Sequence, residues 1–174
     1  MKKVLTYCAV AIMSLAMATA CGQLASIVSS GSSAGAATGK ALKALIDKYL
    51  GNINLGNLAN LGNLGNLGNL GNLGNLGVTL DLSDPATIAN LAQIAKGISG
   101  FNTNNSADYL TQFAEGLMKG TGNALTNEAA VNVSTALRSM AQNPVMATSL
   151  NASSDEEAAR AMVSGVSAIL SQMK

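Results

Sequence analysis

In the second half of the chain, apolar residues recur every three or four positions in four stretches, the spacing of one buried helix face. The connections between these stretches are short, so the pattern predicts an all-α fold, a small antiparallel helical bundle over residues 78–174. The predicted faces are Ile88, Leu91, Ala95 and Ile98; Leu110, Phe113, Ala114 and Leu117; Ala130, Val133, Leu137 and Met140; and Met162, Val163, Val166, Ile169, Leu170 and Met173.

Start and stop signals bound each predicted helix. Capping residues precede the four stretches, and glycine or the residue before a proline follows three of them. The predicted caps are Ser83-Asp84 before Pro85, Asn105 or Ser106, Thr126, and Ser153 and Ser154 with Glu156 and Glu157 three residues on; the stops are Gly100, Gly120 and Asn143-Pro144. Residues 78–82 alternate like a very short strand that lacks a partner.

We expect a core of alanine, methionine and small aliphatic residues, with Phe113, Phe101 and Tyr109 as its large members. Gly116 and Gly165 lie on helix faces, where a missing side chain lets two helices approach closely.

A fifth, shorter pattern precedes this region. Leu42, Leu45, Ile46 and Tyr49 follow helical spacing and end at Gly51, which predicts an amphipathic helix over residues 40–50. We expect it to dock on the C-terminal helices. The alternative is a helix on the membrane surface, with its lysines toward lipid headgroups.

Residues 51–77 carry a period of three: from Asn54 the chain reads NLG, NLA and then NLG six more times. A period of three places the leucines on no single face of a strand or an α-helix, so the segment has no way to bury them by itself. We interpret it as a flexible spacer. Two alternatives are a leucine-edged adhesive segment and a turn of β-helix.

Residues 21–39 are rich in serine, glycine and alanine and are interpreted as a tether. Before them, residues 1–20 have the anatomy of a secretory signal peptide. Lys2 and Lys3 are followed by an apolar run from Val4 to Met17 and by a small-residue cleavage site, Ala18-Thr19-Ala20.

Cys21 follows this cleavage site directly, and Gly22 comes next. The arrangement resembles the lipobox of bacterial lipoproteins, with Ala18 where leucine is usual. The resemblance implies that Cys21 is lipidated and anchors the protein to a membrane, and Gly22 implies the outer membrane, periplasmic face. Ordinary cleavage after Ala20, releasing a soluble protein, stays the alternative. The resemblance covers residues 1–22 only, and no family is recognised for the rest.

The composition excludes several kinds of chemistry. The chain has no histidine and no tryptophan, and of its two cysteines Cys8 lies inside the signal. Histidine-based catalytic triads and the usual zinc, haem and iron–sulfur sites are therefore excluded, and we expect no cofactor and no metal. The chain has ten basic and nine acidic residues without a basic cluster, so no nucleic acid partner is expected.

Acidic residues are the remaining candidates for chemistry. Asp155, Glu156 and Glu157 fall in a predicted first helical turn, where they offset the helix dipole. An enzyme would have to use carboxylates alone, for example Asp108, Glu115 or Glu128, and no spacing brings a pair together.

The sequence therefore predicts a non-enzymatic, lipid-anchored bacterial envelope protein. It would present a small helical domain on a flexible spacer, for protein interaction or a structural role. The partner is an unknown envelope protein or a second copy of the chain. The alternative is a secreted, self-assembling or surface-coating protein that uses the leucine edge of the repeat.

Overall fold

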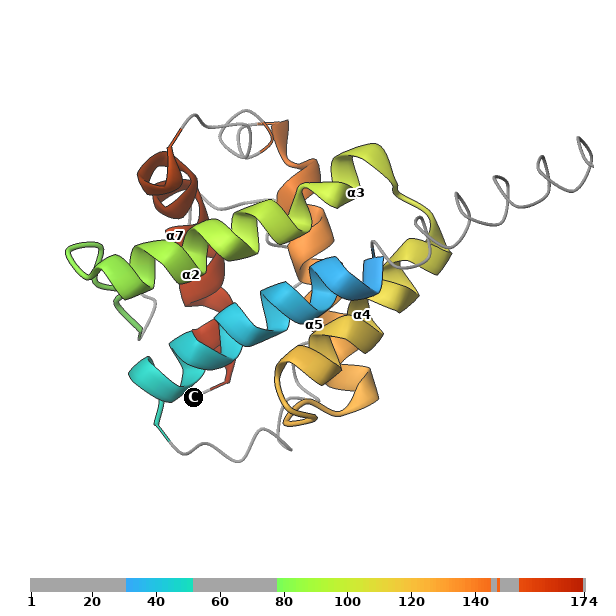
Figure 1. Cartoon of the computed structure of the whole chain (residues 1–174), viewed down its shortest axis with the longest axis horizontal. Helices are drawn as coiled ribbons and strands as arrows, with labels where there is room; N and C mark the ends of the chain where they lie inside the picture. The colour runs from blue at the N-terminus through green and yellow to red at the C-terminus, as the bar shows by residue number, and fades with distance from the viewer. Residues whose placement is uncertain (1–30, 52–77, 145–146, 148–153, 174) are drawn as a thin grey trace, which may run out of the picture. The chain divides into compact units, whose positions relative to one another are not determined.

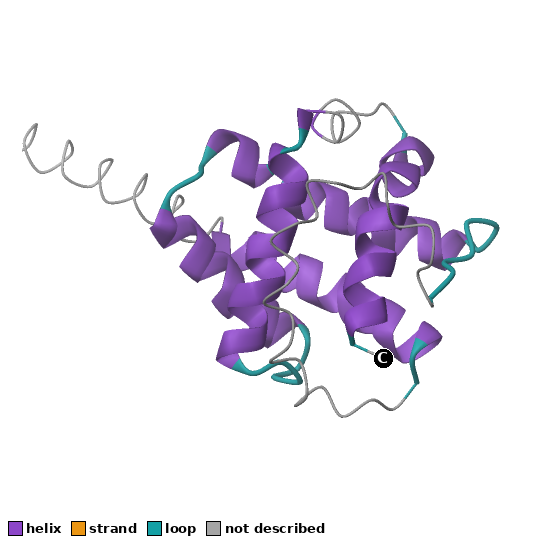
Figure 2. Cartoon of the chain, turned by 180° about the vertical axis from the view of Figure 1, so that it is seen from behind, coloured by secondary structure: helices purple, strands orange, loops and turns teal. Residues whose placement is uncertain are grey.

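The computed structural model describes residues 31–51, 78–144, 147 and 154–173 of the 174-residue chain. These residues are all-α, and no strand occurs among them, which confirms the predicted fold class (Figure 2). The helices are residues 31–49, α2 (Pro85–Ile98), α3 (Gly100–Thr103), α4 (Ala107–Gly120), α5 (Asn127–Gln142) and α7 (Asp155–Gln172) (Figure 1).

Side-chain caps start the four longer C-terminal helices where the sequence predicts them. The carboxylate of Asp84 accepts a hydrogen bond from the backbone N–H of Thr87, and Pro85 fills the first turn of α2. The hydroxyls of Ser106, Thr126 and Ser154 accept equivalent bonds at the starts of α4, α5 and α7. Local sequence is therefore sufficient to fix these starts.

The single-turn helix α3 is not predicted by the sequence pattern. It carries Phe101, which is 1% exposed and packs edge-on against Tyr109, with ring centroids 5.2 Å apart. The ring of Phe113 lies 4.8 Å from that of Phe101. The three aromatic residues therefore form one buried cluster, and their predicted place in the core is confirmed. The short helix α3 positions Phe101 in this cluster.

In the extended segment before α2, buried and exposed side chains alternate as predicted. Val78 and Leu80 are buried while Thr79 and Asp81 are exposed, and the segment pairs with no strand among the described residues. Its two apolar side chains join the core of the bundle.

The helix over residues 31–49 is a core element of the domain. Leu42, Leu45 and Ile46 are at most 1% exposed and belong to the same hydrophobic core as α2, α4, α5 and α7. Burial of three large aliphatic side chains stabilises the domain by several kcal/mol, at about 1.5–3 kcal/mol each. The expected docking on the C-terminal helices is confirmed, and the membrane-surface alternative for this helix is wrong.

This helix lies between α2 and α4 (Figure 1). Tyr49 meets Thr87 at the start of α2, whereas Thr38 lies against Gly97 near its end, so the two helices run antiparallel. Gly39 lies beside Gly120 at the end of α4, and residue 31 lies beside the first turns of α4, so these two helices run parallel.

Glycines on both helices allow the close contact with α4. A Cβ atom on Gly35 would overlap the backbone carbonyl of Phe113, and one on Gly116 would overlap that of Ser32. A Cβ atom on Gly39 would lie 2.5 Å from the carbonyl oxygen of Leu117. Glycines four residues apart leave a groove that admits the neighbouring backbone. The close approach expected at Gly116 is confirmed, and its partner is the N-terminal helix.

The tether predicted for residues 21–39 is wrong over residues 31–39, which are helical. The glycine and serine content of this stretch predicted a linker, because both residues weaken an isolated helix. Packing against α2 and α4 overrides that propensity. The part of the tether over residues 21–30, like the repeat over 52–77, lies outside the described residues.

The domain boundary at residue 78 is therefore also corrected. Residues from Gly31 onward form one compact unit, so the helical domain includes the helix before the repeat. The repeat is inserted within the sequence of this domain rather than placed ahead of it. It cannot act as a spacer between residues 31–49 and the later helices, because both sides share one core.

Candidate functional site

The predicted lipidation site, Cys21, lies outside the described residues, as does the signal peptide before it. In the described part of the chain, no helix has both the length and the apolar character needed to cross a bilayer.

The carboxylates considered for catalysis lie apart on the surface. Asp108 is in the first turn of α4, Glu115 is on the exposed side of the same helix, and Glu128 is in the first turn of α5. Over the ranges that the structure describes, no three acidic or thiol side chains gather to hold a metal ion. The structure therefore brings none of these candidates into a site.

The acidic group at the start of α7 has a structural position. Asp155, Glu156 and Glu157 occupy its first turn, as predicted, and Asp155 pairs with Lys96 of α2 at 2.8 Å. Both partners are well exposed, so the pair contributes about 1 kcal/mol at most. Acidic side chains in the first turn also stabilise α7, because they interact favourably with the positive end of the helix dipole.

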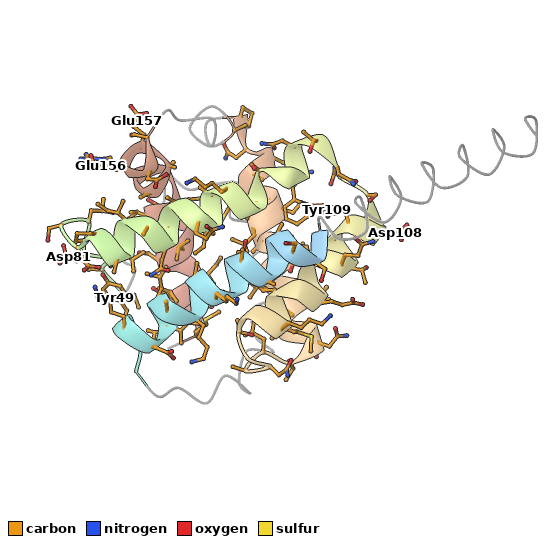
Figure 3. The ribbon with its side chains drawn as sticks, viewed as in Figure 1. Tyr49, Asp81, Asp108, Tyr109, Glu156 and Glu157 are labelled. Atoms are coloured by element: carbon orange, nitrogen blue, oxygen red, sulfur yellow. The ribbon has the colours of Figure 1, made fainter. Side chains whose placement is uncertain are left out.

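The most connected polar group of the described residues joins the two flanks of the repeat. We call it the flank clamp: Lys48 and Tyr49 precede the repeat, and Asp81, Asp84 and Thr87 follow it. The backbone N–H of Asp81 donates to the Tyr49 hydroxyl at 3.0 Å, and Lys48 contacts the Asp84 carboxylate at 2.5 Å. Figure 3 shows Tyr49 and Asp81 together at one end of the bundle.

Thr87 connects the two halves of the flank clamp. Its hydroxyl donates to Asp84 at 2.6 Å, and its oxygen lies 2.7 Å from that of Tyr49. Because the single Thr87 hydroxyl proton is directed to Asp84, the Tyr49 hydroxyl is the donor in the second bond. Thr87 is fully buried, so this chain of hydrogen bonds satisfies a polar group that would otherwise destabilise the core.

The electrostatics of the flank clamp follow from these bonds. The hydrogen bond from Lys48, and then those from Thr87, hold the pKa of the Asp84 carboxyl well below its ordinary value. The same contact raises the pKa of Lys48. Hydrogen bonds from the Ser83 side chain and backbone lower the pKa of Asp81. Each shift favours the charged form of the group.

Both partners of the ion pair therefore stay charged across neutral pH. A general acid or base works best when its pKa lies near the working pH, and these shifts move Lys48 and Asp84 away from it. The flank clamp is suited to holding two segments together, and it is unsuited to proton transfer.

A pocket of about 80 Å³ lies beside the flank clamp, lined by Leu82, Ile88, Glu156 and Arg160. Ligand pockets for small molecules usually span about 300–1,000 Å³. This one is a surface depression between the starts of α2 and α7, too small to enclose a substrate of ordinary size.

Sequence reasoning missed the flank clamp because it read each member by its local role. Tyr49 counts as the last apolar residue of a helix, and Asp84 counts as a cap. A usable signal was the pairing of opposite charges on the two sides of the repeat: Lys48 lies shortly before it, and the polar cluster Asp81, Ser83 and Asp84 lies shortly after it.

No family model, no curated protein and no solved structure matches this chain.

Proposed function

We propose that the protein is a non-enzymatic, lipid-anchored protein of the bacterial envelope that presents a small helical domain for protein interaction or a structural role. The observation that carries this proposal is the position of Cys21, directly after Ala18-Thr19-Ala20 and an apolar run with two lysines before it. Acylation of this cysteine with two or more chains would give stable membrane binding.

Two features of the described residues support an anchored domain with an interaction or structural role. The helical domain begins by residue 31, ten positions after Cys21, and its first helix is locked into the core. The chain has no histidine, and the charged groups of the flank clamp have pKa values shifted away from neutrality. These features favour an interaction or structural role over catalysis.

Replacing the cysteine tests the anchor, and the chain supplies its own matched control. In Cys21→Ser, the protein should move from the membrane fraction to the soluble fraction and lose labelling by a clickable fatty acid. Cys8→Ser removes the other cysteine, which lies inside the signal, and should leave both readouts unchanged. Membrane association and labelling that persist in Cys21→Ser would refute the proposed anchor.

One observation favours self-association through the repeat as a second function. Among the described residues, Val131, 37% exposed, is the one large hydrophobic side chain on the surface. The body therefore offers little apolar area for assembly, whereas every triplet of the repeat brings a leucine. Light scattering of the protein with and without residues 54–77 tests this, and an unchanged particle size would eliminate it.

A further inference from the structure

The helix over residues 31–49 fills a groove between two pairs of helices. Among the helices from α2 onward, α2 packs mainly on α7, and α4 packs mainly on α5. Helix 31–49 lies between α2 and α4 (Figure 1), and Leu42, Leu45 and Ile46 extend from it into the shared core. This helix therefore joins the two pairs, and the groove that it fills is an interaction surface of the later helices.

Missing side chains fit the groove to this particular helix. A Cβ atom on Gly116 or Gly120 of α4 would overlap a backbone carbonyl of helix 31–49. A Cβ atom on Gly97 of α2 would overlap the hydroxyl of Thr38. Because the backbones approach so closely, a helix with larger residues at the contact does not fit. The groove therefore selects the sequence of residues 31–49 as its occupant.

The covalent connection between this helix and the rest of the domain is long. Residues 52–77 separate Gly51 from Val78, and a chain of this length reaches about 90 Å at most. The described arrangement needs far less, because Tyr49 and Asp81 are in hydrogen-bond contact. The connection is therefore long enough for helix 31–49 to reach the groove of a neighbouring copy.

The contacts of the helix in the groove are the same whichever copy supplies it. The balance between the two arrangements then depends on concentration. A helix on a flexible connection competes for its own groove at an effective concentration in the millimolar range, which falls as the connection lengthens. Far below that range each copy fills its own groove, and near it a second copy competes.

We propose that the groove between α2 and α4 also binds helix 31–49 of a second copy, so that two copies exchange this helix and form a dimer when their local concentration reaches about 1 mM. Both hydrophobic cores remain complete in such a dimer. The inference goes beyond the proposed function, because it requires neither the acyl anchor nor contacts between the leucines of the repeat.

Two single-cysteine variants of the full mature chain, both carrying Cys21→Ser, detect the exchange. A Cβ atom on Gly31 would lie 3.1 Å from the Cβ atom of Gln112, close to the separation of about 3.5–4.5 Å in a disulfide. Gly31→Cys and Gln112→Cys proteins with different tags are unfolded in urea, refolded together and oxidised. We expect a disulfide-linked heterodimer after refolding at about 1 mM, and at least about tenfold less of it at about 10 µM.

A third cysteine position controls for random collisions. Glu128 is exposed in the first turn of α5, whereas Gly31 lies beside the first turns of α4, at the other end of that helix. Gly31→Cys refolded with Glu128→Cys should therefore give little heterodimer. Equal yields with positions 112 and 128 would overturn the exchange. So would the absence of heterodimer while the Gly31→Cys, Gln112→Cys double variant closes its own disulfide.

Light scattering gives a second readout that needs no disulfide. Replacing the leucines of residues 54–77 by serine keeps the length of the connection and removes association through the repeat. This protein, refolded at about 1 mM, should contain a dimer that persists after dilution to about 10 µM, because each helix must leave a core before the copies separate. A wholly monomeric sample would refute the exchange, whatever the wild-type repeat does.

Discussion

The hydroxyl of Tyr49 accepts a hydrogen bond from the backbone N–H of Asp81 at 3.0 Å, although 32 positions of sequence separate the two residues. Almost all of those positions belong to the NLG repeat. The two flanks of the repeat are therefore held at one place on the bundle, and the core continues on both sides with Ile46 before the repeat and Val78 after it.

Removing the Tyr49 hydroxyl should weaken the contact between the two flanks of the repeat. In Tyr49→Phe the ring stays, while the hydrogen bonds with Asp81 and Thr87 are lost. We expect the free energy of unfolding to fall by about 1–2 kcal/mol, measured by urea denaturation. Tyr109→Phe is the matched control, because its hydroxyl has no hydrogen-bond partner among the described residues, and it should change stability less. Equal losses in both variants would contradict a special role for Tyr49.

The ion pair of the flank clamp should make stability depend on pH in a defined direction. Because the folded pKa of Asp84 is below the unfolded value, its contribution is complete above about pH 4 and is lost as the pH falls further. Because the folded pKa of Lys48 is raised, its contribution is complete below about pH 10 and is lost as the pH rises further.

Asp84→Asn keeps an N-cap for α2 while it removes the charge. We expect it to lower the urea midpoint at pH 6 and to reduce the loss of stability between pH 5 and pH 2. Glu115→Gln removes one carboxylate from an exposed position elsewhere and controls for net charge. If Asp84→Asn retains the full acid dependence of the wild type, the ion pair does not contribute in the way described.

Replacement of two helix glycines by alanine should destabilise the domain to different extents. In Gly116→Ala the new methyl group meets the backbone carbonyl of Ser32, so helix 31–49 must move, and we expect a loss of about 2–3 kcal/mol. In Gly165→Ala the methyl group meets the end of the Met140 side chain, which can change rotamer. The gain in helix propensity, about 1 kcal/mol, then offsets much of the cost. Thermal unfolding followed by circular dichroism measures both, and similar losses would disprove the close backbone contact.

The number of triplets should matter little to the stability of the domain. Because the flank clamp and the core hold both ends, removing residues 60–71 only shortens a closed loop, and the entropy of closure changes by about 0.6 kcal/mol in the stabilising direction. Inserting the same four triplets a second time should have the opposite, equally small effect. Unfolding of the shortened protein at a much lower temperature would mean that the repeat forms part of the core.

The apolar pattern and the polar capping residues were sufficient to predict the four longer C-terminal helices and their starts. A cap such as Ser106 or Thr126 forms its hydrogen bond three residues away, so its signal is contained in the local sequence. The aromatic core around Phe113 also followed, because large side chains on a helix face are buried almost regardless of the exact topology.

The same reasoning failed for residues 31–39. Gly31, Gly35 and Gly39 are four positions apart, a spacing that marks a helix packed tightly against another, yet glycine and serine are also the residues of linkers. The choice between the two depends on the presence of a complementary groove. That groove is formed by Gly116 and Gly120, about eighty positions away.

By itself, the sequence determined the all-α class and the starts of four helices, because each depends on residues within a few positions of one another. Only the tertiary structure decided that the helix before the repeat belongs to the core and that Tyr49, Thr87 and Asp81 meet. The physical reason is that close packing and hydrogen bonds between distant segments depend on which surfaces fit together, and a periodic pattern along the chain does not record its partner.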